Sequence, residues 1–318
     1  MILTSNMHNK KCIVFGADGY IGRHLMHFLL EAGNAVKAYG LTPDAFSAEF
    51  NYRVVDIANS GNLRGIDWDV DAVFMFAGLA GTHVGFERAE QFIQVNEIGL
   101  VNILEAIRRS GSHPRVIFPS TRLVYQGGEL ALTENDNCLP KTVYAVNKLA
   151  CEQLLNVYSN SFAIDYTIYR ICVPYGNSIG TEYSYGTVGT FIKQAVTNGI
   201  IKLYGDGSLR RTFTHVEDLC HQILVTCLAG SSRNQIYNTL GEDISLRIIA
   251  ESIAHKTSAK LEFTPFPEKD LLIESGHTVF DASKLQRQFS LSLIHTMSEW
   301  VEKIAVSNEY YCTAQPNW

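Results

Sequence analysis

Tyr144 and Lys148 are the residues of this sequence best suited to proton transfer. Their spacing of four places a phenol and an ammonium on one face of a helix predicted over 144–158. A nearby cation stabilises a phenolate, which is the form that a general base needs. Thr121, at the end of an earlier apolar run, could hydrogen-bond the same substrate hydroxyl. A surface Tyr/Lys pair is common in helices, so this pair indicates acid/base chemistry only together with other signals.

A glycine pattern near the start of the chain predicts a dinucleotide site. Gly16, Gly19 and Gly22 follow an apolar, strand-like run and open a helical one. In such a turn the first glycine permits the tight bend, the second lets backbone approach a pyrophosphate, and the third allows close helix–strand packing. The helix start, at Tyr20 and Ile21, would present free N–H groups and a positive dipole end to the phosphates.

The sequence does not distinguish NAD from NADP as the dinucleotide. An Asp or Glu at the end of the second strand usually holds the ribose of NAD, and a nearby Arg accommodates the extra phosphate of NADP. The sequence has Gly40 at that point, followed by Leu41 and Thr42, so NAD and NADP are both allowed. Asp56 and Ile57, ending the third strand, are placed to meet the adenine, although a solvated loop aspartate is nearly as good an interpretation.

Short apolar runs alternate with helix-period segments through the first half of the chain. This alternation predicts an α/β fold of the Rossmann type, a doubly wound parallel sheet, over residues 1–172. A smaller substrate-binding lobe is expected over 173–318, with some segments returning to the first domain, and a Gly- and Tyr-rich stretch (175–189) suits it. The expected strands are 12–17, 35–40, 52–57, 72–78, 115–121 and 165–173, and the expected helices are 20–32, 89–109, 144–158 and one near 190–198.

The ordered set of motifs resembles the extended short-chain dehydrogenase/reductase family, in its NAD-dependent nucleotide-sugar epimerase/dehydratase branch. The glycine turn, Ser120-Thr121 and the Tyr144/Lys148 pair carry this resemblance over nearly the whole chain. Further matching segments are Phe76-Ala77-Gly78, which resembles a cofactor-lining strand, the helix residue Asn96, the nucleotide-holding segments 203–207 and 211–218, and the closing motif 281–285.

The resemblance implies a role for each matching residue. Tyr144 would be the acid/base, Lys148 would bind the nicotinamide ribose and tune Tyr144, and Thr121 would orient the sugar 4-hydroxyl. Arg211 would hold the diphosphate of a nucleotide-diphosphate sugar, which suits a bidentate guanidinium. Tyr204 would stack on the nucleobase, with core packing beside a turn as an equal alternative. Ser120, Arg122 and Val173 would complete the substrate site.

Three positions depart from the pattern of the family. Dehydratases of this branch have an Asp-Glu pair directly after the Thr, but this chain has Arg122-Leu123, so elimination of water lacks its usual groups. Arg122 could add a cation to the site, point into solvent or pair with an acid. Val173 replaces an Asn that contacts substrate, and Ala80 replaces a lysine found in some epimerases.

The function expected from these residues is a nucleotide-sugar 4-epimerase, which acts through a transient 4-keto sugar with hydride passing to and from bound NAD(P). The alternative is an NADPH-dependent 4-ketoreductase. A dehydratase ranks lower, as does a non-catalytic cofactor-binding protein. The family also implies a homodimer.

Composition excludes several other classes of protein. The net charge of −6 gives no general attraction to nucleic acid or anionic membranes, and no apolar run is long enough to span a bilayer. Seven scattered cysteines without a CxxC pair, and a polar start with no signal peptide, predict a cytoplasmic protein with reduced thiols. His24 and His27 lack a third ligand, so no metal site is expected.

Overall fold

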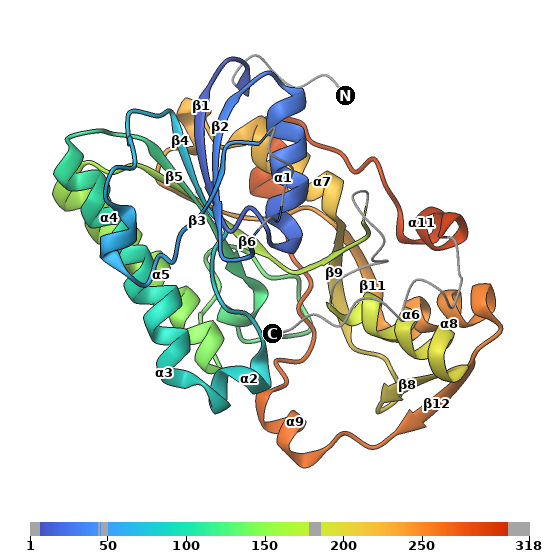
Figure 1. Cartoon of the computed structure of the whole chain (residues 1–318). Helices are drawn as coiled ribbons and strands as arrows, with labels where there is room; N and C mark the ends of the chain where they lie inside the picture. Colours follow the sequence, from blue (N-terminus) through green and yellow to red (C-terminus); the bar gives the residue numbers. More distant parts are fainter. Residues whose placement is uncertain (1–6, 44, 46–49, 178–185, 305–318) are drawn as a thin grey trace.

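A seven-stranded parallel sheet forms the centre of the protein in the computed structural model, which describes residues 7–43, 45, 50–177 and 186–304 (Figure 1). The strand order is β10-β6-β5-β4-β1-β2-β3. This is the predicted Rossmann-type sheet, and the fold class is confirmed. The strands are β1 (Lys11–Phe15), β2 (Ala35–Gly40), β3 (Tyr52–Val54), β4 (Ala72–Met75), β5 (Arg115–Thr121), β6 (Tyr166–Ile171) and β10 (Gln235–Asn238).

Helices cover both faces of this sheet. On one face α1 (Tyr20–Glu31) packs beside α7 (Val216–Thr226), with Leu25 and Ile223 in the shared core (Figure 1). On the other face lie α4 (Gly99–Ser110) and α5 (Val143–Phe162), which bury Leu104 and Leu155 against the strands. Because α7 and β10 come from the second half of the sequence, that half contributes to the layers of the large sheet.

The remaining elements form a smaller lobe with its own apolar core. A three-stranded sheet has the order β11-β9-β7, and β12 pairs with β8 in a two-stranded sheet. The elements are β7 (Val173–Tyr175), α6 (Gly186–Asn198), β8 (Ile200–Tyr204), β9 (Arg210–His215), β11 (Glu242–Ser245), α8 (Leu246–Thr257), β12 (Lys260–Thr264), α9 (Glu268–Ile273) and α11 (Met297–Lys303). The helix α10 (Ser283–Phe289) instead contributes Leu285 to the core of the large sheet. Residues 178–185 of the Gly- and Tyr-rich stretch lie outside the described residues.

Two of the expected strands differ from the structure. The strand expected over 165–173 is broken at Cys172, so that β6 lies in the large sheet and β7 in the small one. This single apolar run therefore links the two lobes. The break at Cys172 is not visible in the sequence, because the hydrophobic pattern is continuous through it. The strand expected over 52–57 ends at Val54, because β3 is the short edge of the sheet.

The long helix expected over 89–109 is also interrupted. The helix α3 (Ala89–Phe92) leads into a π-helical turn, Ile93–Ile98, and only then into α4. The wider turn rotates the side chains, so Ile98 is 39% exposed and Asn96 is 4% exposed. Ile98 continues the apolar helical spacing of Val101 and Leu104, yet the π-helical turn leaves it exposed. Such turns occur frequently at functional sites.

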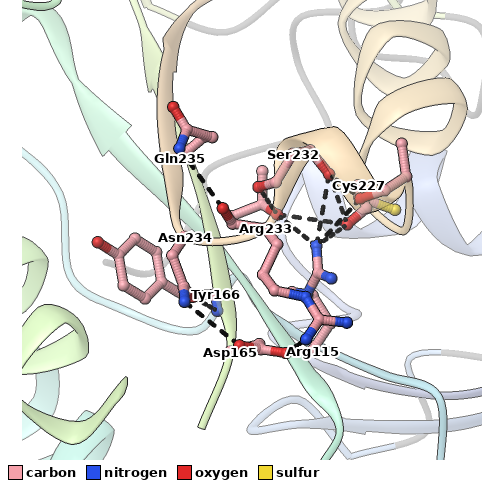
Figure 2. Close-up of polar contacts among 10 residues, drawn as sticks. Arg115, Asp165, Tyr166, Cys227, Ser232, Arg233, Asn234 and Gln235 are labelled. Atoms are coloured by element: carbon pink, nitrogen blue, oxygen red, sulfur yellow. Dashed lines mark hydrogen bonds and ion pairs between the residues drawn. The ribbon is translucent and has the colours of Figure 1, made fainter. Parts of the chain in front are cut away.

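The connection from α7 to β10 is fastened at the amino end of the sheet by a buried arginine. Figure 2 shows the Arg115 guanidinium among the backbone and side chains that follow α7. Its Nη1 donates to the carbonyl of Cys227 at 3.2 Å and to Ser232 Oγ at 3.4 Å. Beside it, Arg233 pairs with Asp165 at 3.2 Å. This cluster lies at the end of the strands opposite to the predicted site.

No helix within the described ranges is long and apolar enough to cross a lipid bilayer. The six cysteines in the described part of the chain are free thiols, and Cys312 lies outside it.

Candidate active site

The glycine turn lies between β1 and α1, where its glycines allow close backbone approach. Gly16 has a φ of +76°, and a Cβ there would lie 2.5 Å from the backbone of Ala77. A Cβ on Gly22 would lie 2.0 Å from the carbonyl oxygen of Gly16. Gly19 has an ordinary φ of −76°, and a Cβ there would meet only the Gly16 oxygen, at 3.2 Å. The protein's own packing therefore requires Gly16 and Gly22 most strictly.

The start of α1 is suited to a phosphate group. Within the described residues no side chain caps this helix, whose N-cap is Gly19. Its first N–H groups and its dipole therefore favour an anion. The Tyr20 hydroxyl donates to the carbonyl of Gly176 at 2.5 Å, so its ring links the turn to the end of β7, and Ile21 packs on the core.

A carboxylate lies at the end of β2 although the strand itself supplies none. Asp18, from the glycine turn, accepts hydrogen bonds from the backbone N–H groups of Leu41 at 3.0 Å and Thr42 at 2.8 Å. A Cβ on Gly40 would lie 2.1 Å from Asp18 Oδ1. Gly40 is thus the residue that makes room for this carboxylate. The sequence showed only that position 40 lacked an acid, because the reach of Asp18 depends on the turn.

Thr121, Tyr144 and Lys148 come from β5 and α5, which pack against each other. Thr121 is the last residue of β5. Thr142 caps α5 by accepting a hydrogen bond from the Ala145 N–H at 3.2 Å, which sets the first turn of the helix and hence Tyr144. Lys148, one turn later, donates to the carbonyl of Pro119 on β5 at 2.8 Å. The strand end and the helix start therefore share a direct polar contact.

The surroundings of Lys148 suit a tuning role. Its ammonium nitrogen lies 4.5 Å from the centroid of the Phe118 ring and 6.0 Å from that of Tyr144. The side chain is 7% exposed, and burial lowers the pKa of the ammonium from 10.5 to about 8. A cation so close to the Tyr144 ring favours its phenolate form.

Asn96 holds the loop that follows β4. Its side-chain oxygen accepts from the Leu79 N–H at 2.7 Å, and its side-chain nitrogen donates to the Leu79 carbonyl at 3.0 Å. Phe76, Ala77 and Gly78 lie in the chain segment just before, against the glycine turn. Their predicted contact with a cofactor is compatible with this position.

Asp56 and Ile57 lie past the end of β3. The Asp56 carboxylate accepts from the Ala58 N–H at 2.9 Å, which forms a local turn. Ile57 is 4% exposed and belongs to the core under α4. Both have structural roles, and contact with an adenine stays a prediction.

Ser120 takes part in a buried polar network behind the end of β5. Its hydroxyl is hydrogen-bonded to Glu152, which forms a buried ion pair with Arg170 at 2.7 Å. Successive residues of a strand point to opposite faces, and Ser120 points to the face on which Glu152 lies. Ser120 thus has a structural role in this buried network, which also includes Tyr125, and its contact with substrate stays a prediction.

Arg122 and Arg211 lie together where the two lobes meet. Arg122, half-buried in the turn after β5, donates to Thr278 Oγ1 at 3.1 Å. Arg211, on β9, is 8% exposed and pairs with Glu274 at 3.0 Å. Burial, and then the charge of Arg211, lower the pKa of Arg122 from 12.5 to about 10. Thus Arg122 does not point freely into solvent.

The two other substrate residues expected from the sequence have different surroundings. Val173 is 7% exposed and belongs to the core of the smaller lobe. Tyr204 is 47% exposed, and its ring centroid lies 5.5 Å from that of Phe266. The core alternative for Tyr204 is therefore wrong, while stacking on a base stays a prediction.

Three potential metal ligands also lie close together. Ligand atoms of His215, Glu217 and His295 lie within 4.8 Å of one another. The two imidazole rings are stacked, with centroids 4.2 Å apart and planes 28° apart. An imidazole binds a metal in its own plane, so rings stacked in this way do not direct two nitrogens at one ion. His295 instead lies 3.2 Å from the Glu217 carboxylate. Sequence spacing gave no hint of this group, because His295 is far in the chain from His215 and Glu217.

Comparisons with known proteins agree with this fold. The model of the NAD dependent epimerase/dehydratase family matches residues 12–239. A UDP-glucuronate 4-epimerase of Thermodesulfobacterium geofontis is 25% identical over 300 residues, which cover 86% of this chain and 88% of that protein. A UDP-N-acetyl-alpha-D-glucosaminuronate decarboxylase of Bacillus cytotoxicus is 27% identical over 273 residues, covering 81% and 84%. Among solved structures, the UDP-glucose 4-epimerase of Thermus thermophilus in complex with NAD has a TM-score of 0.81 at 22% identity, covering 92% of this chain and 96% of that one.

The fold combines a parallel sheet, a glycine turn that can bind phosphate, and a Thr, a Tyr and a Lys where β5 and α5 meet. This combination is typical of enzymes that use a dinucleotide cofactor. The chain belongs to the NAD dependent epimerase/dehydratase family. Its cofactor is accordingly a nicotinamide dinucleotide.

Proposed function

We propose that this protein is a nucleotide-sugar 4-epimerase. The observation that carries the proposal is the pairing of Tyr144 with a buried Lys148, whose ammonium is anchored to the Pro119 carbonyl beneath it. Family membership supports a nucleotide sugar as the substrate, since the relatives described above have such activities in their names. The dinucleotide, when bound at the glycine turn, supplies the acceptor and donor of hydride.

The roles of the protein's own residues follow from their chemistry. Thr121 would hold the 4-hydroxyl of the sugar, and Tyr144 would accept its proton as the carbon is oxidised. Lys148 would stabilise the phenolate through this step. The resulting 4-keto sugar would turn within the site and present the opposite face of C4 to the returning hydride, while Tyr144 would return the proton to the 4-oxygen. The reaction is redox-neutral overall, because hydride lost at C4 is regained there.

The alternative is a 4-ketoreductase, which would use the same residues once in each turnover. Purified wild-type protein should carry bound cofactor and interconvert C4 epimers without added reductant. Tyr144→Phe should lower turnover by about 10³-fold or more, because the variant lacks the hydroxyl that transfers the proton. The bound cofactor should stay in place, because nothing else in the site changes. Protein that exchanges cofactor freely and oxidises NADPH only with a 4-keto sugar would establish the reductase instead. Turnover that survives in Tyr144→Phe would contradict the mechanism.

We further propose that the cofactor is NAD rather than NADP. Asp18 places a carboxylate at the end of β2, where the ribose hydroxyls of a dinucleotide lie in this fold. A carboxylate accepts hydrogen bonds from hydroxyls and repels the additional phosphate of NADP. Gly40 has no side chain to fill this position, so Asp18 from the glycine turn can take the place of the acidic residue that usually ends the second strand.

Asp18→Asn tests this choice with little change in shape. The amide oxygen can still accept from the backbone of residues 41 and 42, whereas the negative charge is lost. Discrimination between NAD⁺ and NADP⁺, measured as the ratio of their Kd values by calorimetry, should fall by about tenfold or more. Tighter binding of NADP⁺ by the wild type, or an unchanged ratio in the variant, would refute the role of Asp18.

A further inference from the structure

Arg122 and Arg211, at the junction of the two lobes, carry more positive charge than the nearby acidic side chains neutralise. Arg122 and Arg211 share one nearby carboxylate, Glu274, which is bonded to Arg211 at 3.0 Å. Arg122 makes its hydrogen bond to the neutral hydroxyl of Thr278. In Arg211, the Nε atom is buried and has no hydrogen-bond partner among the described residues. Two guanidinium groups with one carboxylate leave a net positive charge at a site where Arg211 is buried and Arg122 is half-buried.

An excess of positive charge in a partly buried site is unfavourable unless a ligand supplies the missing negative charge. Thr278, which is 0% exposed, fixes the position of Arg122 and pairs in a β-bridge with Arg211. The two arginines are therefore held together by one backbone segment. This arrangement is a preformed receptor for anionic groups.

The position of Arg122 in the chain indicates which end of the substrate it meets. It follows Thr121 directly, whereas Arg211 comes from a different strand of the smaller lobe. In a hexopyranose, C6 is attached to C5, the neighbour of C4. If Thr121 holds the 4-hydroxyl, a charged group on C6 lies next to it, within reach of the adjacent residue. The diphosphate lies farther along the substrate, where Arg211 is available.

We propose that the sugar of the natural substrate carries a carboxylate at C6, and that Arg122 is the specificity-determining residue that binds it. The substrate class is thus a nucleotide-linked hexuronate. This inference rests on the proposed function, since it assumes that Thr121 faces the 4-hydroxyl. The two curated relatives described above act, by their names, on a glucuronate and a glucosaminuronate.

A matched pair of ligands tests the proposal. UDP-glucuronate and UDP-glucose differ only in carboxylate against hydroxymethyl at C6, and UDP alone probes the diphosphate. Binding of each to the NAD-loaded protein is measured by calorimetry, and turnover is measured separately. The wild type should bind UDP-glucuronate at least tenfold more tightly than UDP-glucose. Arg122→Gln should remove this preference and change the affinity for UDP by less than threefold, and Arg122→Lys should restore part of the preference.

Arg210→Gln is the control, because Arg210 lies beside Arg211 on β9 but pairs with Asp243 on β11. It should leave all three affinities unchanged. Thermal melting of each variant verifies that the fold is retained.

Each other outcome has a definite meaning. An equal loss of affinity for all three ligands in Arg122→Gln would overturn the proposal and assign Arg122 to the diphosphate. A wild type that prefers UDP-glucose, or that binds no UDP-glucuronate at millimolar concentration, would also overturn it. Turnover of UDP-glucose without a uronate preference would leave the epimerase proposal standing alone. Arg122-dependent binding of UDP-glucuronate without turnover would support the carboxylate site and reject the epimerase.

Discussion

The ammonium of Lys148 is buried between the ring of Phe118 and the first turn of α5, with the Pro119 carbonyl as its hydrogen-bond acceptor. Burial lowers its pKa to about 8, so the folded protein holds the proton less tightly than the unfolded chain, in which the pKa is 10.5. Below pH 8 both states are protonated, and the cost of burying the charge is present in full. Between pH 8 and 10.5 only the unfolded chain keeps the proton, so this residue makes stability rise with pH in that window.

Lys148→Met should therefore raise the free energy of unfolding and abolish turnover. The cofactor-free variant should unfold with a free energy about 1–3 kcal/mol higher than the wild type at pH 7, because the desolvation cost disappears. Its advantage should shrink at pH 9.5, and its turnover should be lost. Denaturant unfolding at the two pH values measures both effects. A variant that is less stable than the wild type by the same amount at both pH values would show that the contacts of the ammonium outweigh its burial.

Residue-scale chemistry was predictable where it depends on local spacing. Tyr144 and Lys148 lie on one helix, and Gly16 and Gly22 lie in one turn, so the sequence alone indicated their arrangement. Asp18 was missed because its carboxylate serves the end of a different strand. The hydrogen bond of Ser120 to Glu152 was not predictable either, because both faces of β5 are buried and the apolar pattern does not show which way each side chain points. The proximity of Arg122 to Arg211 was not predictable, because both contact Thr278, which is far from each of them in the chain.

The elements position these residues through contacts that periodicity does not reveal. The π-helical turn brings Asn96 inward, where it holds the loop after β4. The spacing of apolar residues does not reveal the extra residue in that turn, because the same spacing is compatible with an uninterrupted α-helix. The break at Cys172 is likewise hidden within one apolar run, although it separates the two sheets.

The arginine at the amino end of β5 provides an element-scale test of stability. Arg115 bonds the carbonyl of Cys227 and the hydroxyl of Thr167, both buried, and so fastens the α7–β10 connection to the sheet. Arg115→Leu should lower the free energy of unfolding by about 2–4 kcal/mol, because buried acceptors lose their donor. Affinity for NAD should not change, since the cluster lies at the opposite end of the strands. Chemical denaturation and calorimetry together check this. A loss of NAD affinity in a fully folded variant would contradict the separation of the two ends.

At the scale of the whole molecule, one face of the helical layer is left apolar and exposed. Phe86 on α2 (Thr82–Glu87), Ile93 and Val146 are 52%, 44% and 49% exposed, and they line one groove with Pro140 and Val143. We propose that a second copy of the chain covers this face, in keeping with the homodimer that the family resemblance implies.

Val146→Lys should convert the dimer to a monomer, because a charge would then be buried against an apolar partner. Val54→Lys is the matched control, since Val54 is 54% exposed on the edge strand β3. Light scattering after size-exclusion chromatography measures the mass of each. A wild type that remains monomeric at micromolar concentration, or a Val146→Lys variant that remains dimeric, would place the interface elsewhere or exclude it.

The fate of the hydrogen at C4 of the sugar tests the central proposal most directly. Purified protein is given UDP-glucuronate labelled with deuterium at C4, with no added reductant, and the products are followed by NMR and mass spectrometry. An epimerase that acts through Tyr144 and a retained dinucleotide should form the C4 epimer with the deuterium still at C4, and Tyr144→Phe should form none. Loss of the label from C4, or product that appears only when NADPH is supplied, would contradict the account. UDP-galactose labelled in the same way provides the test with an uncharged sugar.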